Sequence, residues 1–203
     1  MRRLIAAMML CSASAAFAGA QKYEPLAASV QGALHKAVSD SRPMVSSFKN
    51  PLEAADWLGE MSRRLSKRIP DREYRLDLLR SVHYEATRAG LDPQLILGLM
   101  QVESGFRKYA VSSVGARGYM QVMPFWVKLI GRPDDNLFDL RTSLRYGCTI
   151  LRHYLDIEKG DLYRALGRYN GSLGKPEYPN MVRAAWQNNW SYEAAPRLAQ
   201  TGR

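Results

Sequence analysis

The chain has 203 residues, a formal net charge of +10 and a hydrophobic content of 46%. This length favours one domain with a short appended segment and excludes a multidomain machine. Glycine and proline are not enriched, so collagen-like and disordered compositions are excluded as well. The positive charge agrees with nucleic acid, an anionic membrane surface or an acidic polymer as the partner, and composition alone does not choose among them.

The first twenty residues have the features of a secretory signal peptide. Arg2 and Arg3 form a basic start, an apolar run follows, and residues 16–18 read Ala-Phe-Ala, an A-x-A cleavage site. A short membrane anchor is the alternative, but the apolar run is shorter than the ~20 residues that span a bilayer. We therefore expect residues 1–20 to be cleaved and the product to be periplasmic. Export argues against nucleic acid and favours an anionic envelope polymer as the partner.

Cys148 is the one cysteine that remains after this cleavage, so no internal disulfide is expected. It lies among leucines at helical spacing, which favours a buried apolar thiol over a nucleophile. The three histidines, His35, His83 and His153, lack metal-ligand spacing, and the sequence contains no phosphate loop. The sequence therefore implies no metal and no cofactor.

The pattern after the leader is helical. Asn50-Pro51 and Asp92-Pro93 each combine a capping residue with a proline at the first helical position. We expect helices over residues 27–38, 71–89, 140–158, 161–169 and 180–189. Two further helices are expected to begin at residues 51 and 93, and the first of these ends before Pro70. Period-2 alternation is almost absent, so the predicted fold is all-α.

Glu103 lies on an apolar stripe of the helix that begins at Pro93. Residues three, four and seven apart share a face, which places Ile96, Leu99 and Met100 beside it. Burial there would raise the carboxyl pKa above its reference of ~4.3 and keep the acid protonated, as a general acid requires. The alternative is a helix-terminal side chain that reaches solvent or pairs with Arg107.

The segment 119–126 gathers large aromatic side chains around the amide of Gln121. Aromatic faces and an amide suit a sugar-binding groove, because a pyranose has an apolar face and polar substituents. Gly118 would allow close approach of the backbone. A core helix with one exposed glutamine is the alternative.

Four short segments carry a family resemblance. Residues 103–106 read Glu-Ser-Gly-Phe, 118–124 read Gly-Tyr-Met-Gln-Val-Met-Pro, 136–139 read Asn-Leu-Phe-Asp and 168–171 read Arg-Tyr-Asn-Gly. In order and spacing they resemble the catalytic domain of the soluble lytic transglycosylases, which are relatives of goose-type lysozyme. The resemblance implies a lysozyme-like single globular domain over 76–192, a partly helical N-terminal extension over 21–75 and a tail over 193–203.

The resemblance also implies an activity. Glu103 would be the single catalytic acid/base, and Ser104, Met120, Gln121, Tyr169 and Asn170 would be the substrate-binding residues. Each of these five has a structural alternative, such as core packing for Met120, a helix-terminal hydrogen bond for Ser104 and plain burial for Tyr169. The enzyme would cleave the MurNAc-GlcNAc β-1,4 bond of peptidoglycan and leave 1,6-anhydro-MurNAc ends. Glu85 is the best remaining candidate for a second acid, which a conventional glycosidase needs.

The expected partner is the peptidoglycan glycan strand, and the expected state is a monomer. A dedicated link to an envelope-spanning machine is left open. Two rival functions remain at this point: a muramidase of the same fold, and a non-catalytic peptidoglycan-binding module.

Overall fold

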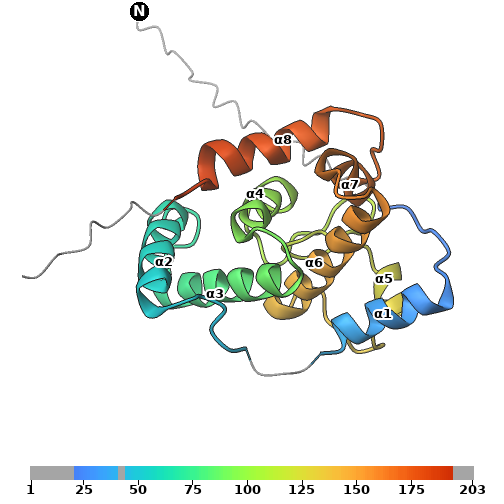
Figure 1. Cartoon of the computed structure of the whole chain (residues 1–203), viewed down its shortest axis with the longest axis horizontal. Helices are drawn as coiled ribbons and strands as arrows, with labels where there is room; N and C mark the ends of the chain where they lie inside the picture. Colours follow the sequence, from blue (N-terminus) through green and yellow to red (C-terminus); the bar gives the residue numbers. More distant parts are fainter. Residues whose placement is uncertain (1–20, 41–43, 194–203) are drawn as a thin grey trace, which may run out of the picture.

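The computed structural model describes residues 21–40 and 44–193, and the chain is helical over most of those ranges (Figure 1). The predicted signal peptide and nearly all of the predicted tail lie outside them. The helices are α1 (Ala28–Val38), α2 (Pro51–Leu65), α3 (Arg72–Arg88), α4 (Pro93–Glu103), α5 (Phe125–Ile130), α6 (Leu140–Ile157), α7 (Leu162–Asn170), α8 (Glu177–Ala185) and a π-helical turn η1 (Trp186–Trp190). Within the described residues, strand-like pairing is limited to isolated bridges around Arg117. The all-α prediction is confirmed.

Side-chain caps fix where the helices begin. The Asn50 side chain accepts a hydrogen bond from the Glu53 N–H, and the caps Asp71, Asp92, Asp139 and Asp161 accept in the same way. Each cap satisfies N–H groups that the first turn of a helix leaves free. The predicted starts of α2, α3, α4, α6 and α7 are confirmed to within one residue for this local reason.

Two details of the predicted helices are wrong. The helix expected over 180–189 begins three residues earlier, at Glu177, and from Trp186 onward it is the π-helical turn. Pro179 lies in the first turn of α8, where a residue without an N–H is tolerated, so it does not mark the helix start. The second is the short helix α5, which follows Pro124 and was not among the expected helices. The residues around it show no clear helical period.

The helix α4 occupies the centre of the molecule, and in Figure 1 it lies between α3 and α8. Every residue from Leu95 to Met100 is buried, and the helix contacts α3, α8 and η1. Gly98 permits a close approach of α4 to η1, because a Cβ there would lie 2.8 Å from the backbone nitrogen of Trp186. The C-terminal residue of α4, Glu103, therefore ends inside the protein.

The N-terminal extension packs against the rest of the chain. The helix α1 contacts α5 and α6, and α2 contacts α3. The Gln31 side chain donates to the Leu129 carbonyl at 2.7 Å, and the His35 ring lies 3.0 Å from the Ile130 carbonyl. Cys148 is fully buried in α6, as predicted, and burial raises the pKa of its thiol. None of the helices in the described ranges is both long and apolar enough to cross a membrane.

Candidate active site

Glu103 is a buried carboxyl with a single direct partner among the hydrogen bonds of the described chain. Its side chain stands at the end of α4, and the residue is 8% exposed. The Tyr178 hydroxyl donates to Glu103 Oε1 at 2.5 Å. Burial raises the carboxyl pKa to about 8, and the bond from Tyr178 acts in the opposite direction. The burial of Glu103 therefore gives a physical basis for the prediction that its carboxyl stays protonated.

A cation would cancel this effect, and none pairs with Glu103 in the described ranges. Arg107, the partner considered from the sequence, instead donates from Nε to the Ser104 carbonyl at 2.9 Å. The chain turns sharply here, since Gly105 and Phe106 both have positive φ angles, of 58° and 65°. The turn carries the chain away from the end of α4 and leaves the carboxyl behind in the interior. Neither alternative for Glu103, solvent exposure or pairing with Arg107, is what the structure contains.

The residues next to the acid form a hydrogen-bonded wall. Ser104 Oγ donates to the Tyr119 carbonyl at 2.9 Å, and the Tyr169 hydroxyl donates to the Met120 carbonyl at 2.7 Å. Met120 itself is fully buried. These contacts bring three of the predicted segments together, and they agree with the structural alternatives for Ser104, Met120 and Tyr169. The charge of Glu103 still acts on Tyr169, where burial first and this carboxylate second raise the hydroxyl pKa well above its usual range.

Gln121 holds the neighbouring loop rather than presenting its amide to solvent. Its Nε2 donates to the carbonyls of Ala110 and Gly118 at 3.1 and 3.0 Å, and its own backbone has a φ of 48°. Gly118 is required here, since its φ is 73° and a Cβ would lie 2.1 Å from the Leu137 carbonyl oxygen. Asn170 is buried at the end of α7, where Gly171 closes the helix in the left-handed conformation.

Tyr178 makes a contact at this site that the sequence did not predict, the hydrogen bond from its hydroxyl to Glu103. It is fully buried in α8, and burial followed by the Glu103 charge raises the pKa of its hydroxyl, so it remains a donor. The resemblance placed Tyr169 among the site residues instead, and the hydroxyl of that tyrosine donates to the Met120 carbonyl. Tyr178 is 75 positions from Glu103, and only the packing of α8 on α4 joins them.

Glu85, the candidate for a second acid, has a different environment. It is fully buried in α3, where Arg145 Nη2 lies 2.7 Å from Oε1 and Arg88 Nε lies 2.8 Å from Oε2. Both of its carboxylate oxygens are therefore held by guanidinium groups. A carboxylate held in this way is suited to joining α3 to α6 and not to exchanging protons with a substrate.

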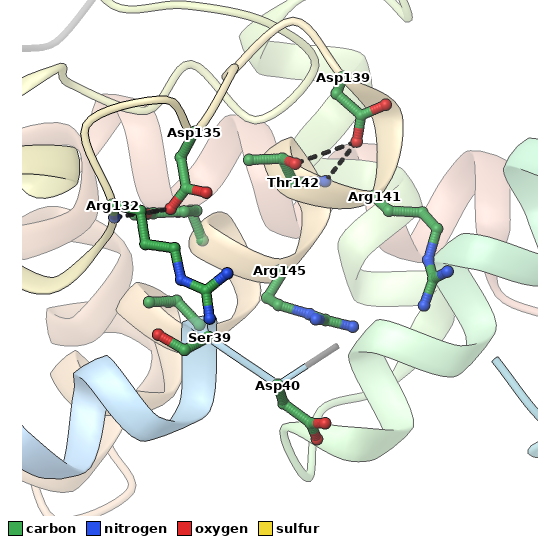
Figure 2. A pocket seen from close by; sticks show the side chains of 10 residues that line it. Ser39, Asp40, Arg132, Asp135, Asp139, Arg141, Thr142 and Arg145 are labelled. Carbon is green, nitrogen blue, oxygen red and sulfur yellow. Dashed lines mark hydrogen bonds between the residues drawn. The ribbon is translucent and has the colours of Figure 1, made fainter. Parts of the chain in front are cut away.

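A polar pocket of about 320 Å³ lies at the start of α6, and none of its ten lining residues is a predicted site residue (Figure 2). Its arginines come from the loop before α6 and from α6 itself. Asp139 caps α6 through Thr142, and Asp135 accepts from the Arg132 N–H and the Tyr146 hydroxyl. The aspartates drawn on that loop thus have structural partners. Within the described ranges, no three His, Cys, Asp or Glu side chains gather to hold a metal ion.

A family model described as "Transglycosylase SLT domain" matches residues 80–185, more than half of the 203 residues. The chain belongs to this family. The match begins in α3 and ends with α8, so it includes Glu103, Tyr178 and the wall between them.

Curated relatives of this SLT domain carry transglycosylase names. A transglycosylase of Enterobacteria phage PRD1 is 36% identical over 88 residues, which are 43% of this chain and 32% of that protein. The membrane-bound lytic murein transglycosylase C of Mannheimia succiniciproducens is 50% identical over 79 residues, covering 34% of this chain and 22% of that protein. The same-named protein of Actinobacillus pleuropneumoniae serotype 5b is 59% identical over 39 residues, covering 19% and 11%. The chain thus spans about a third or less of the length of these relatives.

A solved structure is also similar. It is the X-ray structure of an inactive Glu-to-Gln mutant of the lytic transglycosylase Slt from Pseudomonas aeruginosa. The identity is 21%, the TM-score is 0.44, and the similarity covers 64% of this chain and 25% of that chain.

The SLT domain of this chain thus contains an acid suited to proton transfer. A carboxyl with a pKa of about 8 keeps its proton at neutral pH. Because this pKa is close to neutral pH, the carboxyl can also release the proton to a substrate. The hydrogen bond from the Tyr178 hydroxyl to Oε1 orients this carboxyl.

Proposed function

We propose that this protein is a lytic transglycosylase that cleaves the MurNAc-GlcNAc β-1,4 bond of peptidoglycan and leaves 1,6-anhydro-MurNAc ends. The observation that carries the proposal is Glu103, a buried carboxyl whose pKa burial raises to about 8. Membership of the SLT domain family and the names of the curated relatives support the same reaction class.

In the proposed reaction, Glu103 acts as both acid and base. The protonated carboxyl donates to the glycosidic oxygen as the bond to C1 of MurNAc breaks, and GlcNAc leaves with a free hydroxyl. The C6 hydroxyl of the same MurNAc then attacks C1 and returns its proton to Glu103. One C–O bond is broken and one is formed, the acid is regenerated, and no water is consumed.

The surroundings of the two buried acids support a mechanism with one carboxyl. A conventional glycosidase uses a pair of carboxyl groups about 5–10 Å apart. Glu85, the second candidate from the sequence, is bonded to two arginines and belongs to the packing of α3. A substrate that supplies its own nucleophile from C6 removes the need for a second acid.

We assign supporting roles to the five other predicted residues. Ser104, Met120 and Tyr169 fix the wall behind the acid through their hydrogen bonds to one another's segments. Gln121 holds the loop that bounds the same wall, and Asn170 lies buried beside it at the end of α7. In this proposal the substrate meets the surface that the wall supports, in the periplasm to which the predicted signal peptide directs the chain.

Mass spectrometry of digested peptidoglycan sacculi tests the proposal. The purified protein is expected to release 1,6-anhydromuropeptides, and Glu103→Gln is expected to reduce their release by roughly 10²–10⁴-fold. Glu177→Gln is the matched control, because it removes an exposed carboxyl next to Tyr178.

Reducing sugar ends in place of anhydro ends would identify a muramidase and contradict the proposed product. Binding to sacculi without any release, unchanged by Glu103→Gln, would identify a non-catalytic binding module instead.

A further inference from the structure

Gln21, the first described residue, is a buried polar side chain that the proposed reaction does not use. The residue is 4% exposed although it lies in a segment outside the helices. Its Oε1 accepts from the Met123 N–H at 3.1 Å, and its Nε2 donates to the Gln121 carbonyl at 3.3 Å. A hydrogen bond from the same side chain also lowers the pKa of Tyr169, against the larger effect of burial.

The residues after Gln21 continue along the same predicted motifs. The Tyr23 ring meets the Phe125 ring edge-on, with centroids 5.7 Å apart. Glu24 Oε1 lies 3.4 Å from Arg168 Nη1. In Figure 1 this blue segment begins beside α7 and leads to α1. The segment therefore crosses two of the four motif segments, 118–124 and 168–171, at the wall behind Glu103.

The bonds of Gln21 have a particular chemical form. The Gln121 carbonyl and the Met123 N–H are backbone groups two positions apart, and one planar amide satisfies both of them. Buried backbone groups need such partners. The acetamido substituent of an N-acetylated sugar is also a planar amide, with one N–H donor and one carbonyl acceptor. Gln21 thus presents to this wall the same pair of groups that an N-acetylated sugar would present.

The rest of the segment is held weakly. Tyr23 is largely exposed, and the Glu24 side chain is about half exposed, so its pairing with Arg168 is of the kind that contributes little. The attachment of the segment at the wall depends mainly on the Gln21 amide. The segment is therefore able to detach without unfolding a helix.

We propose that residues 21–24 form an occluding strap, in which the Gln21 amide occupies the place of a substrate acetamido group until an N-acetylated glycan displaces it. This inference rests on the proposed function for the class of substrate. It adds a self-inhibited resting state to the enzyme, with opening driven by the substrate itself.

Binding of chitotetraose, a tetramer of N-acetylglucosamine, tests the strap by isothermal titration calorimetry. Gln21→Ala is expected to bind roughly tenfold more tightly than the unaltered protein, a difference of about 1.4 kcal/mol. Gln31→Ala is the matched control, because Gln31 also donates its amide to a backbone carbonyl, but on α5. The control is expected to bind as the unaltered protein does.

Side-chain amide signals in ¹⁵N NMR spectra give a second readout. Saturating chitotetraose is expected to move the Gln21 signal to the position of a solvent-exposed amide and to leave the Gln31 signal in place. The proposal is overturned if Gln21→Ala binds equally or more weakly, if the Gln21 signal stays unchanged at saturation, or if neither protein binds chitotetraose.

These results are separable from the failure of the proposed function. Displacement of Gln21 by chitotetraose without any anhydromuropeptide from sacculi would contradict the proposed function and support the strap. Anhydromuropeptide release with no effect of Gln21→Ala on binding would support the proposed function and contradict the strap.

Discussion

Glu85 and Glu103 are both buried carboxyl groups of the central helices, and their surroundings are opposite. Glu85 on α3 is held by Arg88 and Arg145 at 2.7–2.8 Å. Glu103 on α4 receives one hydrogen bond from a neutral tyrosine, Tyr178, and burial raises its pKa to about 8. The partner, and not the depth of burial, decides which carboxyl is a structural ion pair and which is a proton donor.

The comparison predicts, first, a pH-dependent stability cost at Glu103. The folded-state pKa of about 8 exceeds the ordinary value of 4.5, so the folded chain keeps a proton that the unfolded chain loses between these two pH values. The stabilising effect of this group is complete below pH 4.5 and is lost as pH rises to about 8. The glutamine side chain of Glu103→Gln does not titrate. The free energy of unfolding of this variant is therefore expected to rise by up to about 5 kcal/mol relative to that of the unaltered protein between pH 4.5 and pH 8.

Urea unfolding of both proteins at pH 4.5 and pH 8.5 measures this difference. Titrations elsewhere in the chain are common to the two proteins and cancel. An equal stability difference at the two pH values would mean that Glu103 is ionised in the folded protein at neutral pH.

The second prediction concerns Glu85→Gln, which leaves the buried Arg145 and the partly buried Arg88 without their carboxylate. We expect a loss of about 3–5 kcal/mol in the free energy of unfolding, because an uncompensated buried charge remains. Glu60→Gln is a matched control, since Glu60 also pairs with two arginines, Arg63 and Arg64, but near the surface. The control is expected to cost less than about 1 kcal/mol.

Denaturant unfolding of these two variants gives the comparison directly. A variant of Glu85 as stable as that of Glu60 would show that the buried ion pairs do not hold α3 to α6. Loss of activity from a fully folded Glu85→Gln protein would instead make Glu85 part of the reaction.

The third prediction is smaller and concerns the one direct partner of Glu103. The hydrogen bond from Tyr178 lowers the pKa of Glu103, so Tyr178→Phe is expected to raise it further. The alkaline limb of the pH–rate profile should move upward by up to about one pH unit, the equivalent of one hydrogen bond. Tyr169→Phe is the control, because that hydroxyl donates to the Met120 carbonyl and not to the acid.

Rates of anhydromuropeptide release between pH 5 and pH 10 measure both profiles. A downward shift in Tyr178→Phe, or equal shifts in the two variants, would contradict the assigned role of Tyr178.

Much of the fold was predictable because its signals are local. Asn50, Asp71 and Asp92 satisfy N–H groups within three residues of themselves, so the sequence alone reveals where their helices begin. The apolar stripe that marks Glu103 is likewise contained in one helix. The helix α5 has only six residues, too few to show a period, and it was missed.

The rest of the site depends on contacts between distant segments. Nothing near Tyr178 in the sequence indicates that its hydroxyl reaches Glu103, because the contact is made by α8 packing on α4. The sequence likewise does not indicate that Glu85 pairs with Arg145, because the two residues are 60 positions apart. Gln21 is 100 positions from Gln121, in a stretch with no pattern at all.

The protonation state of Glu103 is the centre of this account, and its carboxyl can be titrated directly. In ¹³C NMR spectra of protein labelled at glutamate side chains, the Glu103 signal is the one absent from Glu103→Gln. This signal is expected to titrate with a pKa of about 8. A titration near the ordinary value of 4.5 would contradict it, because Glu103 would then be ionised at neutral pH and unable to donate the proton.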